Sequence, residues 1–125
     1  MWLQVEVADS AGKKVYSSGH VDDKNHVDPD AVFFRVLFKD AEGHLTGKSW
    51  QAHGIGYDRR IPANGKDSET YYIPLPGNGE YQVTSRLMYR SMTQNSLDEI
   101  FKRTGQHLPP VVSVEMAAAQ TNVRY

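Results

Sequence analysis

Cysteine is absent from this 125-residue chain. Its absence excludes disulfide bonds, cysteine nucleophiles, cysteine-ligated zinc, iron–sulfur clusters and covalent attachment of c-type haem within these residues. Long apolar runs are also missing, since the longest have four residues, at 31–34 and 116–119. A transmembrane helix needs about 20 apolar residues. We therefore expect no helix that crosses a membrane.

A charge excess of either sign is missing too. Lys and Arg number 14, Asp and Glu number 15, and the formal net charge is −1. Non-specific binding to nucleic acid needs a basic excess that this chain does not have, so we expect no nucleic-acid partner. The start of the chain lacks the basic and apolar regions of a signal peptide. The length favours a single domain over residues 1–125, and because its first strand begins at residue 2 without a lead-in, we expect a fragment of a longer chain.

Alternation of apolar and polar residues dominates the chain and predicts β-strands. Two Asp-x-x-Gly turns, Asp9–Gly12 and Asp40–Gly43, are typical of hairpins. The segments 19–29 and 52–66 are polar or rich in glycine and are expected to be loops. The alternation predicts strands at residues 2–8, 13–18, 32–39, 44–51, 70–75, 81–89 and 111–117, the last extending toward 123.

One helix is expected near residues 96–104. Ser96-Leu-Asp-Glu99 has the spacing of a capping box, in which Ser96 would cap the helix. Gly105 is suited to end it, and Pro109-Pro110 prevents its continuation. With about seven strands and no alternation of strands and helices, the chain is predicted to be all-β, an immunoglobulin-like antiparallel β-sandwich. A small barrel is the second architecture.

Catalytic patterns are lacking. The chain has five histidines, but no H-E-x-x-H motif and no G-x-S-x-G motif, and no sequence spacing groups a nucleophile with a base. We therefore expect no enzyme and no catalytic residue.

A metal site is the alternative for one loop. It holds His20 and His26 among four aspartates, Asp22, Asp23, Asp28 and Asp30. Oxygen-rich loops bind calcium, and an adjacent histidine suits a softer metal. The spacing is not that of an EF-hand, so a solvated loop without metal is the favoured interpretation.

Aromatic side chains suggest a second kind of function. A row of them on one sheet face could stack on sugar rings, as in a carbohydrate- or surface-binding module. The simpler interpretation is that they pack between the sheets. The candidates are Trp50, Tyr57, Tyr71, Tyr72 and Tyr81.

Several segments in order resemble a recurring haem-free β-domain at the C-terminal end of bacterial multihaem cytochrome c family proteins. The most specific is Ser85-Arg-Leu-Met-Tyr-Arg90, which is similar to the Ala-Arg-Leu-x-Tyr-Arg strand of that family, with Ser85 in place of alanine. The Cys-x-x-Cys-His haem motifs and the Gly-His-x-x-Pro segment of such proteins are missing here. The other segments are Trp2-Leu-Gln-Val-Glu-Val-Ala-Asp9 with Gly12, Val15-Tyr-Ser-Ser-Gly19, the Asp40–Gly43 turn with Trp50, and Arg60-Ile-Pro62.

The resemblance implies a non-catalytic domain that supports electron transfer in an exported, periplasmic or extracellular, protein. It implies no cofactor in this chain but haem c in the parent protein. The partner would be the haem-bearing domain of the same polypeptide or a redox partner protein.

The resemblance also suggests where a partner would dock. Arg86 and Arg90, with Met88 between them, would share one strand face and bind haem propionates or acidic groups. Cross-strand salt bridges are the simpler alternative for these arginines. As a further hypothesis, His20, His26 or His53 would supply a haem ligand to the partner. An uncovered edge at residues 2–8 would predict weak self-association there.

Overall fold

The structure, a computed structural model, describes residues 1–125 as two compact units. The first comprises residues 1–32 and 71–125, and the second comprises residues 33–70. The two antiparallel sheets have four and three strands, and there is one α-helix. The predicted class, a strand-rich fold with one helix, is confirmed, and its content is that of a small, sandwich-like all-β protein. A single domain over the whole chain stays a prediction.

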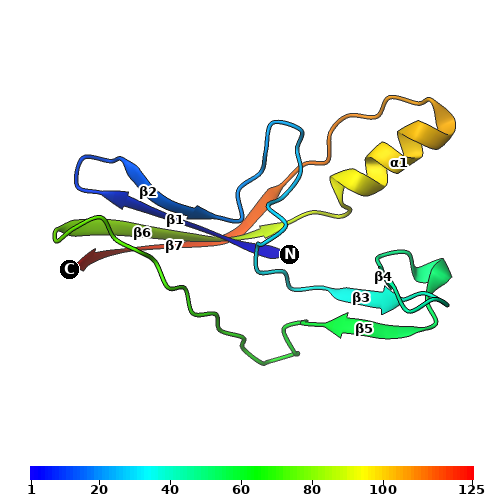
Figure 1. The fold of residues 1–125 in the computed structure, drawn as a ribbon, viewed down its shortest axis with the longest axis horizontal. Helices are drawn as coiled ribbons and strands as arrows, with labels where there is room; N and C mark the ends of the chain where they lie inside the picture. The colour runs from blue at the N-terminus through cyan, green and yellow to red at the C-terminus, as the bar shows by residue number, and fades with distance from the viewer. The chain divides into compact units, whose positions relative to one another are not determined.

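The first unit is built on a four-stranded sheet in the order β2-β1-β6-β7 (Figure 1). The expected strand at 111–117 in fact begins at Val114 and runs on to Arg124, while the other three strands lie within one residue of their expected bounds. Because β1 lies between β2 and β6, it is not a free edge, and self-association through residues 2–8 has no support. The elements are β1 (Trp2–Asp9), β2 (Lys14–Ser18), β6 (Glu80–Tyr89), α1 (Gln94–Thr104) and β7 (Val114–Arg124).

The alternation in β1 and β6 separates an apolar face from a polar one. Val7 lies opposite Val83, and both Val5 and Val7 are buried. On the other face Glu6 lies opposite Thr84, and Gln4 lies opposite Arg86. Burial of β-branched side chains on one face is what fixes the register, because a shift of one residue would expose them all.

Trp2 is an exception on the polar face, where it is only 2% exposed. Its indole Nε1 donates a hydrogen bond of 2.9 Å to the carbonyl oxygen of Gly19. Gly19 has a φ of +73°, and a Cβ at this position would lie 2.1 Å from the carbonyl oxygen of Leu3. Only glycine allows this close approach and backbone conformation. The end of β2 is thereby fixed against the start of β1.

The expected strand at residues 70–75 does not form. Tyr71, Ile73 and Leu75 are half-buried in alternation with exposed neighbours, but no strand pairs with them. The ring of Tyr71 packs edge-on against Tyr16 with the centroids 6.4 Å apart. The period of two in this segment thus comes from side-chain packing and not from a hydrogen-bonded ladder.

Helix α1 begins earlier than expected. Its N-cap is Thr93, whose side-chain oxygen accepts a hydrogen bond from the backbone N–H of Ser96, so the prediction of Ser96 as the cap was wrong. The earlier start brings Gln94 into the helix, where it and Leu97 are the two buried residues. The predicted end is confirmed, since Gly105 has a φ of +69° and its N–H bonds the carbonyl oxygen of Phe101.

The second unit contains a three-stranded sheet in the order β4-β3-β5. The Asp40–Gly43 turn forms as expected, with Asp40 Oδ1 accepting from the backbone N–H groups of Glu42 and His44. The elements are β3 (Val36–Lys39), β4 (Leu45–Thr46), the short 3-10 helix η1 (Ser49–Gln51) and β5 (Gly54–Asp58).

Three expectations for the second unit were wrong. The strand expected at 32–39 covers only its second half, and the one expected at 44–51 is reduced to two residues followed by η1. The segment 52–66, expected to be a loop, contains β5. Gly54 and Gly56 both lie within β5, and a Cβ at Gly56 would lie 2.4 Å from Leu45 Cδ2 on the neighbouring chain segment. Glycine marks a close approach here rather than a loop.

We predict that Gly19→Ala lowers the free energy of unfolding by about 3 kcal/mol, since it adds a backbone clash to the cost of the left-handed conformation. Gly12→Ala is the matched control. Gly12 has a φ of +78°, but a Cβ at this position would meet no atom within 4 Å, so its cost should be about 1 kcal/mol. Urea unfolding measures both, and equal losses would contradict the close-approach argument.

Candidate functional site

A partly buried polar cluster forms around the guanidinium group of Arg90, directly after β6. Its Nη1 donates to the carbonyl oxygen of Asn25 and its Nη2 donates to Asn25 Oδ1, both at 2.7 Å. Its Nε donates to Ser113 Oγ at 2.8 Å, and its Cζ lies 5.4 Å from the ring centroid of Trp2. Burial lowers the pKa of Arg90 from its usual value, but arginine remains charged in proteins. We call this cluster the Arg90 junction and include in it Trp2, Asn25, His26, Gln94, Asp98, Val111 and Ser113.

Asn25 connects Arg90 to the helix. Its φ of +65° is a left-handed conformation that asparagine tolerates, and it turns both oxygens toward the guanidinium. Its Nδ2 donates to Gln94 Oε1 at 2.7 Å and to the carbonyl oxygen of Val111 at 2.9 Å. One side chain therefore holds the loop, the helix start and the segment before β7 together.

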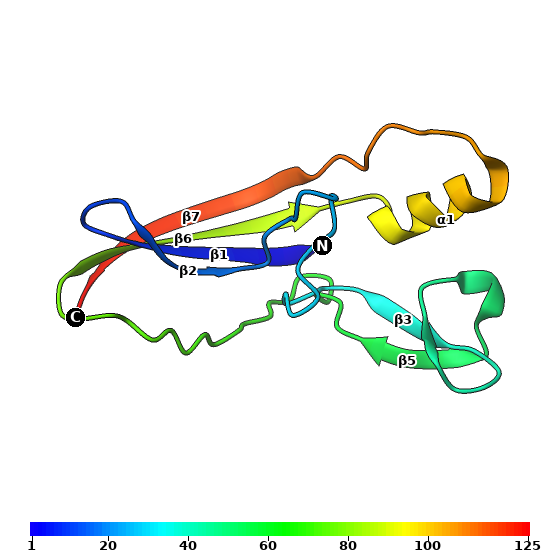
Figure 2. The ribbon, with the colours of Figure 1, turned by 45° about the horizontal axis from the view of Figure 1, so that its top comes forward.

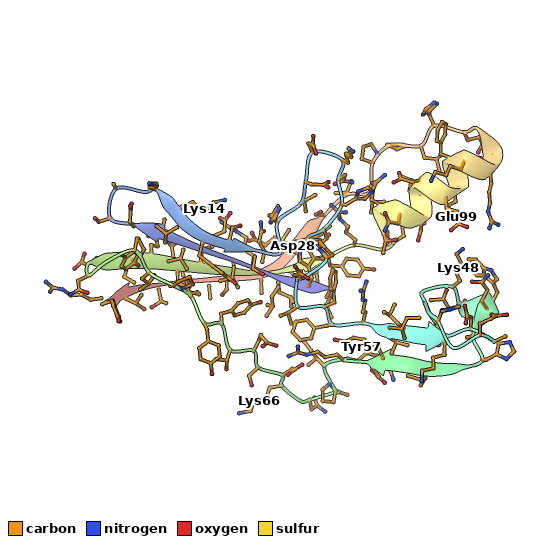
Figure 3. The ribbon with its side chains drawn as sticks, viewed as in Figure 1. Lys14, Asp28, Lys48, Tyr57, Lys66 and Glu99 are labelled. Carbon is orange, nitrogen blue, oxygen red and sulfur yellow. The ribbon has the colours of Figure 1, made fainter.

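Gln94 and Asp98 carry the network along α1. Gln94 Oε1 also accepts from the backbone N–H of Val111 at 3.2 Å, and its Nε2 donates to Asp98 Oδ1 at 2.9 Å. His26 Nε2 lies 3.0 Å from Asp98 Oδ2. The hydrogen bond from Gln94, and then that from His26, lowers the pKa of Asp98. Figure 3 labels Asp28 on the loop and Glu99 on α1, the two elements that the network connects.

The aspartates of the loop shape turns. Asp22 Oδ1 accepts from the backbone N–H groups of Lys24 and His26, and Asp28 Oδ2 accepts from that of Gly19. No three acidic or histidine side chains gather closely enough to hold a metal ion. The geometry therefore gives the metal alternative no support.

Arg86 lies on the polar face of the sheet between two carboxylates. Its Nη1 is 3.3 Å from Glu6 Oε2, and its Nε is 3.3 Å from Glu115 Oε2. Glu6 also accepts a hydrogen bond from Lys14, which is the main cause of its lowered pKa, and Arg86 adds to the effect. Met88 lies on the same face, opposite Trp2.

The two arginines thus have separate environments, because Arg86 forms cross-strand ion pairs while Arg90 is enclosed in the junction. Docking through Arg86, Met88 and Arg90 stays a prediction. Arg86 and Met88 are the more available of the three residues for a partner, since each nitrogen of the Arg90 guanidinium already donates a hydrogen bond within the chain.

The three histidines named for a haem ligand differ in how free their rings are. His26 has a carboxylate near each ring nitrogen, with Nδ1 3.9 Å from Asp22 Oδ2, so it fits such a role poorly. His20 has one weak contact, 3.7 Å between its Nδ1 and Asp28 Oδ2. His53, in the second unit, is exposed. A role as haem ligand stays a hypothesis for His20 and His53.

The aromatic row expected for sugar binding is not continuous within either unit. Trp50 and Tyr57 belong to the second unit, whereas Tyr71, Tyr72 and Tyr81 belong to the first. Tyr81 is buried, and its hydroxyl donates to the carbonyl oxygen of Gly77 at 2.6 Å. Only Trp50 and Tyr72, at 78% and 91% exposure, are fully open to a ligand.

An apolar groove beside the Arg90 junction was not expected from the sequence. It has a volume of about 310 Å³ and lies among residues from β6, α1 and the segment that leads into β7. Val111 belongs to both features, because its carbonyl oxygen accepts from Asn25. The residues that line the groove with carbon atoms include Tyr89, Met92, Leu97, Pro109, Val111 and Val114.

Comparison with known proteins assigns no family to this arrangement. No protein-family model, curated protein or solved structure matches the chain. Among the helices of the structure, none is long and apolar enough to cross a membrane. The role of the site therefore has to be argued from its own chemistry.

We predict that Arg90→Lys lowers the free energy of unfolding by about 2 kcal/mol, because lysine cannot replace the fork that binds both oxygens of Asn25. Arg86→Lys is the matched control on the same strand, and its half-exposed ion pairs should cost less than about 1 kcal/mol. Chemical denaturation followed by circular dichroism measures both. Losses of the same size would mean that the junction does not depend on the guanidinium geometry.

We predict that Asp98 stabilises the fold in a pH-dependent way. Its folded pKa is below the ordinary value of 3.8, so its contribution is present above the unfolded pKa and is lost as the pH falls through the folded one. The difference in unfolding free energy between the native chain and Asp98→Asn should therefore be largest near neutral pH and shrink below about pH 4. A difference that stayed constant from pH 7 to pH 3 would contradict it.

Proposed function

We propose that this chain is a haem-free, non-catalytic structural or docking domain of an exported multihaem c-type cytochrome. The observation that carries the proposal is where the resembling segments meet. Trp2, in the segment 2–9, donates a hydrogen bond to the carbonyl oxygen of Gly19, in the segment 15–19. Arg90, in the segment 85–90, lies over the ring of Trp2. Residues that are 17 and 88 positions apart in the chain thus lie at one place.

This meeting point gives the resemblance a physical meaning. The quoted residues are those that fix a glycine, a buried indole and a guanidinium in one framework, so a chain that shares them in order would share the framework. A fold-level argument of this kind supports a common architecture and leaves function to specific sites. The sites found here bind polypeptide segments and present apolar surface, which suits support and docking better than catalysis.

The chemistry of the proposed role follows from the same features. Without cysteine the chain cannot attach haem covalently, so the redox centres would belong to the rest of the parent protein. Apolar surface such as the groove beside the junction can cover a neighbouring domain and exclude water, which is how a protein shell tunes a nearby haem. Attachment of c-type haem takes place outside the cytoplasm, so the proposal places the domain in the periplasm or outside the cell.

A carbohydrate- or surface-binding module is the second candidate. Its support is the pair of strongly exposed aromatic side chains, Trp50 and Tyr72. It is the weaker candidate, because the buried Tyr81 and the packed Tyr71 remove two members of the expected platform. Stacking on a sugar ring needs an open aromatic face.

The native protein provides the test. An antibody raised against this chain should detect, in a periplasmic or surface fraction of the source cells, a band much larger than 14.1 kDa that also stains for covalent haem. A band of about 14 kDa without haem stain would overturn the proposal. If the chain instead bound polysaccharide, and Trp50→Ala abolished that binding, the second candidate would take its place.

A further inference from the structure

Strand β7 is an unusually open sheet edge. It lies at the edge of the four-stranded sheet and pairs only with β6 (Figure 2). It has 11 residues, and all of them are exposed. Natural edge strands are commonly protected by prolines, by central charges, by bulges or by shortness, and the one bulge of β7 lies near its start, at Met116. Residues 116–123 of β7 contain neither proline nor a charged side chain. The strand therefore presents a long row of backbone groups that can pair with another strand.

The other edge of the same sheet differs. Strand β2 has five residues and carries Lys14 at its start. In the second unit the edge strands β4 and β5 have two and five residues. Only β7 is long enough to add many ladder hydrogen bonds.

A bulge makes the two ends of β7 complementary. Leu87 lies opposite Ala117 and Met88 lies opposite Glu115, so Met116 is an extra residue. As a result Glu115 lies on the same face as Arg124, whose partner on β6 is Glu80. The strand thus has an acid at one end and a base at the other end of one face.

We propose that β7 pairs antiparallel with β7 of a second copy of this chain, about a two-fold axis at Gln120. In this register Ala119 faces Thr121, Ala118 faces Asn122 and Ala117 faces Val123, each across the axis. Beyond them the bulge brings Glu115 of each copy opposite Arg124 of the other. The two four-stranded sheets then continue as one.

The charges of the single chain are compatible with this arrangement. Arg124 lies opposite Glu80 without an ion pair to it, and Glu115, whose Oε2 is 3.3 Å from Arg86 Nε, keeps 51% of its side chain exposed. A shift of the β7–β7 register by two residues would separate both Glu115–Arg124 pairs. The charged ends therefore select one register, whereas the uncharged centre of the strand would allow several. The proposal concerns this chain alone and does not rest on the proposed function.

Single thiols test the register, because the chain has no cysteine of its own. In Gln120→Cys the introduced thiols face each other across the axis, at the spacing of directly opposed residues. In the matched control, Asn122→Cys, they lie about 13 Å apart along the strand. With copper–phenanthroline as oxidant, the first variant should form a disulfide-linked dimer at least about tenfold faster than the second. A mixture of Ala118→Cys and Asn122→Cys should cross-link as a heterodimer.

Charge reversal tests the end pairs. Sedimentation of the chain at about 100 μM should show a weak dimer, and Arg124→Glu should raise its dissociation constant about tenfold, because two like-charge contacts arise per dimer. Adding Glu115→Arg to that variant should restore the affinity to within about threefold. Lys66→Glu makes the same charge change on an exposed side chain remote in sequence and should have no effect.

Each contrary result has a definite meaning. A monomer at that concentration, or equal cross-linking of the thiols at positions 120 and 122, would overturn the proposal. Cross-linking through Ser17→Cys on β2, or a dimer insensitive to Arg124→Glu, would show that the copies meet elsewhere. Thermal melting confirms that each variant is folded, and the thiol variants decide the matter if a charge variant is not.

Discussion

The bonds from Arg90 to both oxygens of Asn25 are the constraint on which the first unit depends. The partly buried guanidinium donates to the backbone oxygen and to the side-chain oxygen of Asn25, a residue with a left-handed backbone conformation. With Asn25 fixed in this way, its amide orients Gln94 and Val111, which set the start of α1 and the approach to β7. The path of the chain after β6 is thus set largely by Arg90, the residue that directly follows the strand.

Much of the sheet could be predicted from the sequence, because the central strands have one buried face. Val5 and Val7 alternate with polar residues for that physical reason, and the hairpin turn between β1 and β2 has Asp9 and Gly12 where they are needed. The strand predictions were wrong where the alternation of apolar and polar residues does not coincide with pairing to another strand. The segment 70–75 alternates without a partner strand, and β5 pairs although its glycines resemble a loop. Whether a partner strand exists is long-range information that a local pattern does not contain.

The site was less predictable for a related reason. Arg90 and His26 could be named from the sequence, but their partners come from positions 65 and 72 residues away. Asn25, Gln94 and Ser113 have no motif that distinguishes them from ordinary surface amides and hydroxyls. The one local signal for Asn25 is its position in a polar loop, because asparagine tolerates a left-handed backbone.

The Arg90 junction, at the end of β6, and the free edge of β7 differ in how their polar groups are used. At the junction, Arg90, Asn25 and Gln94 direct their polar groups to partners within the chain. Along β7 the opposite holds, because backbone groups at the edge lack a neighbour and the uncharged centre offers nothing that repels one. The bulge at Met116 would normally protect an edge by twisting it. Here the bulge instead places Glu115 on the same face as Arg124. The same bulge that distorts the start of β7 therefore gives the strand opposite charges at its two ends.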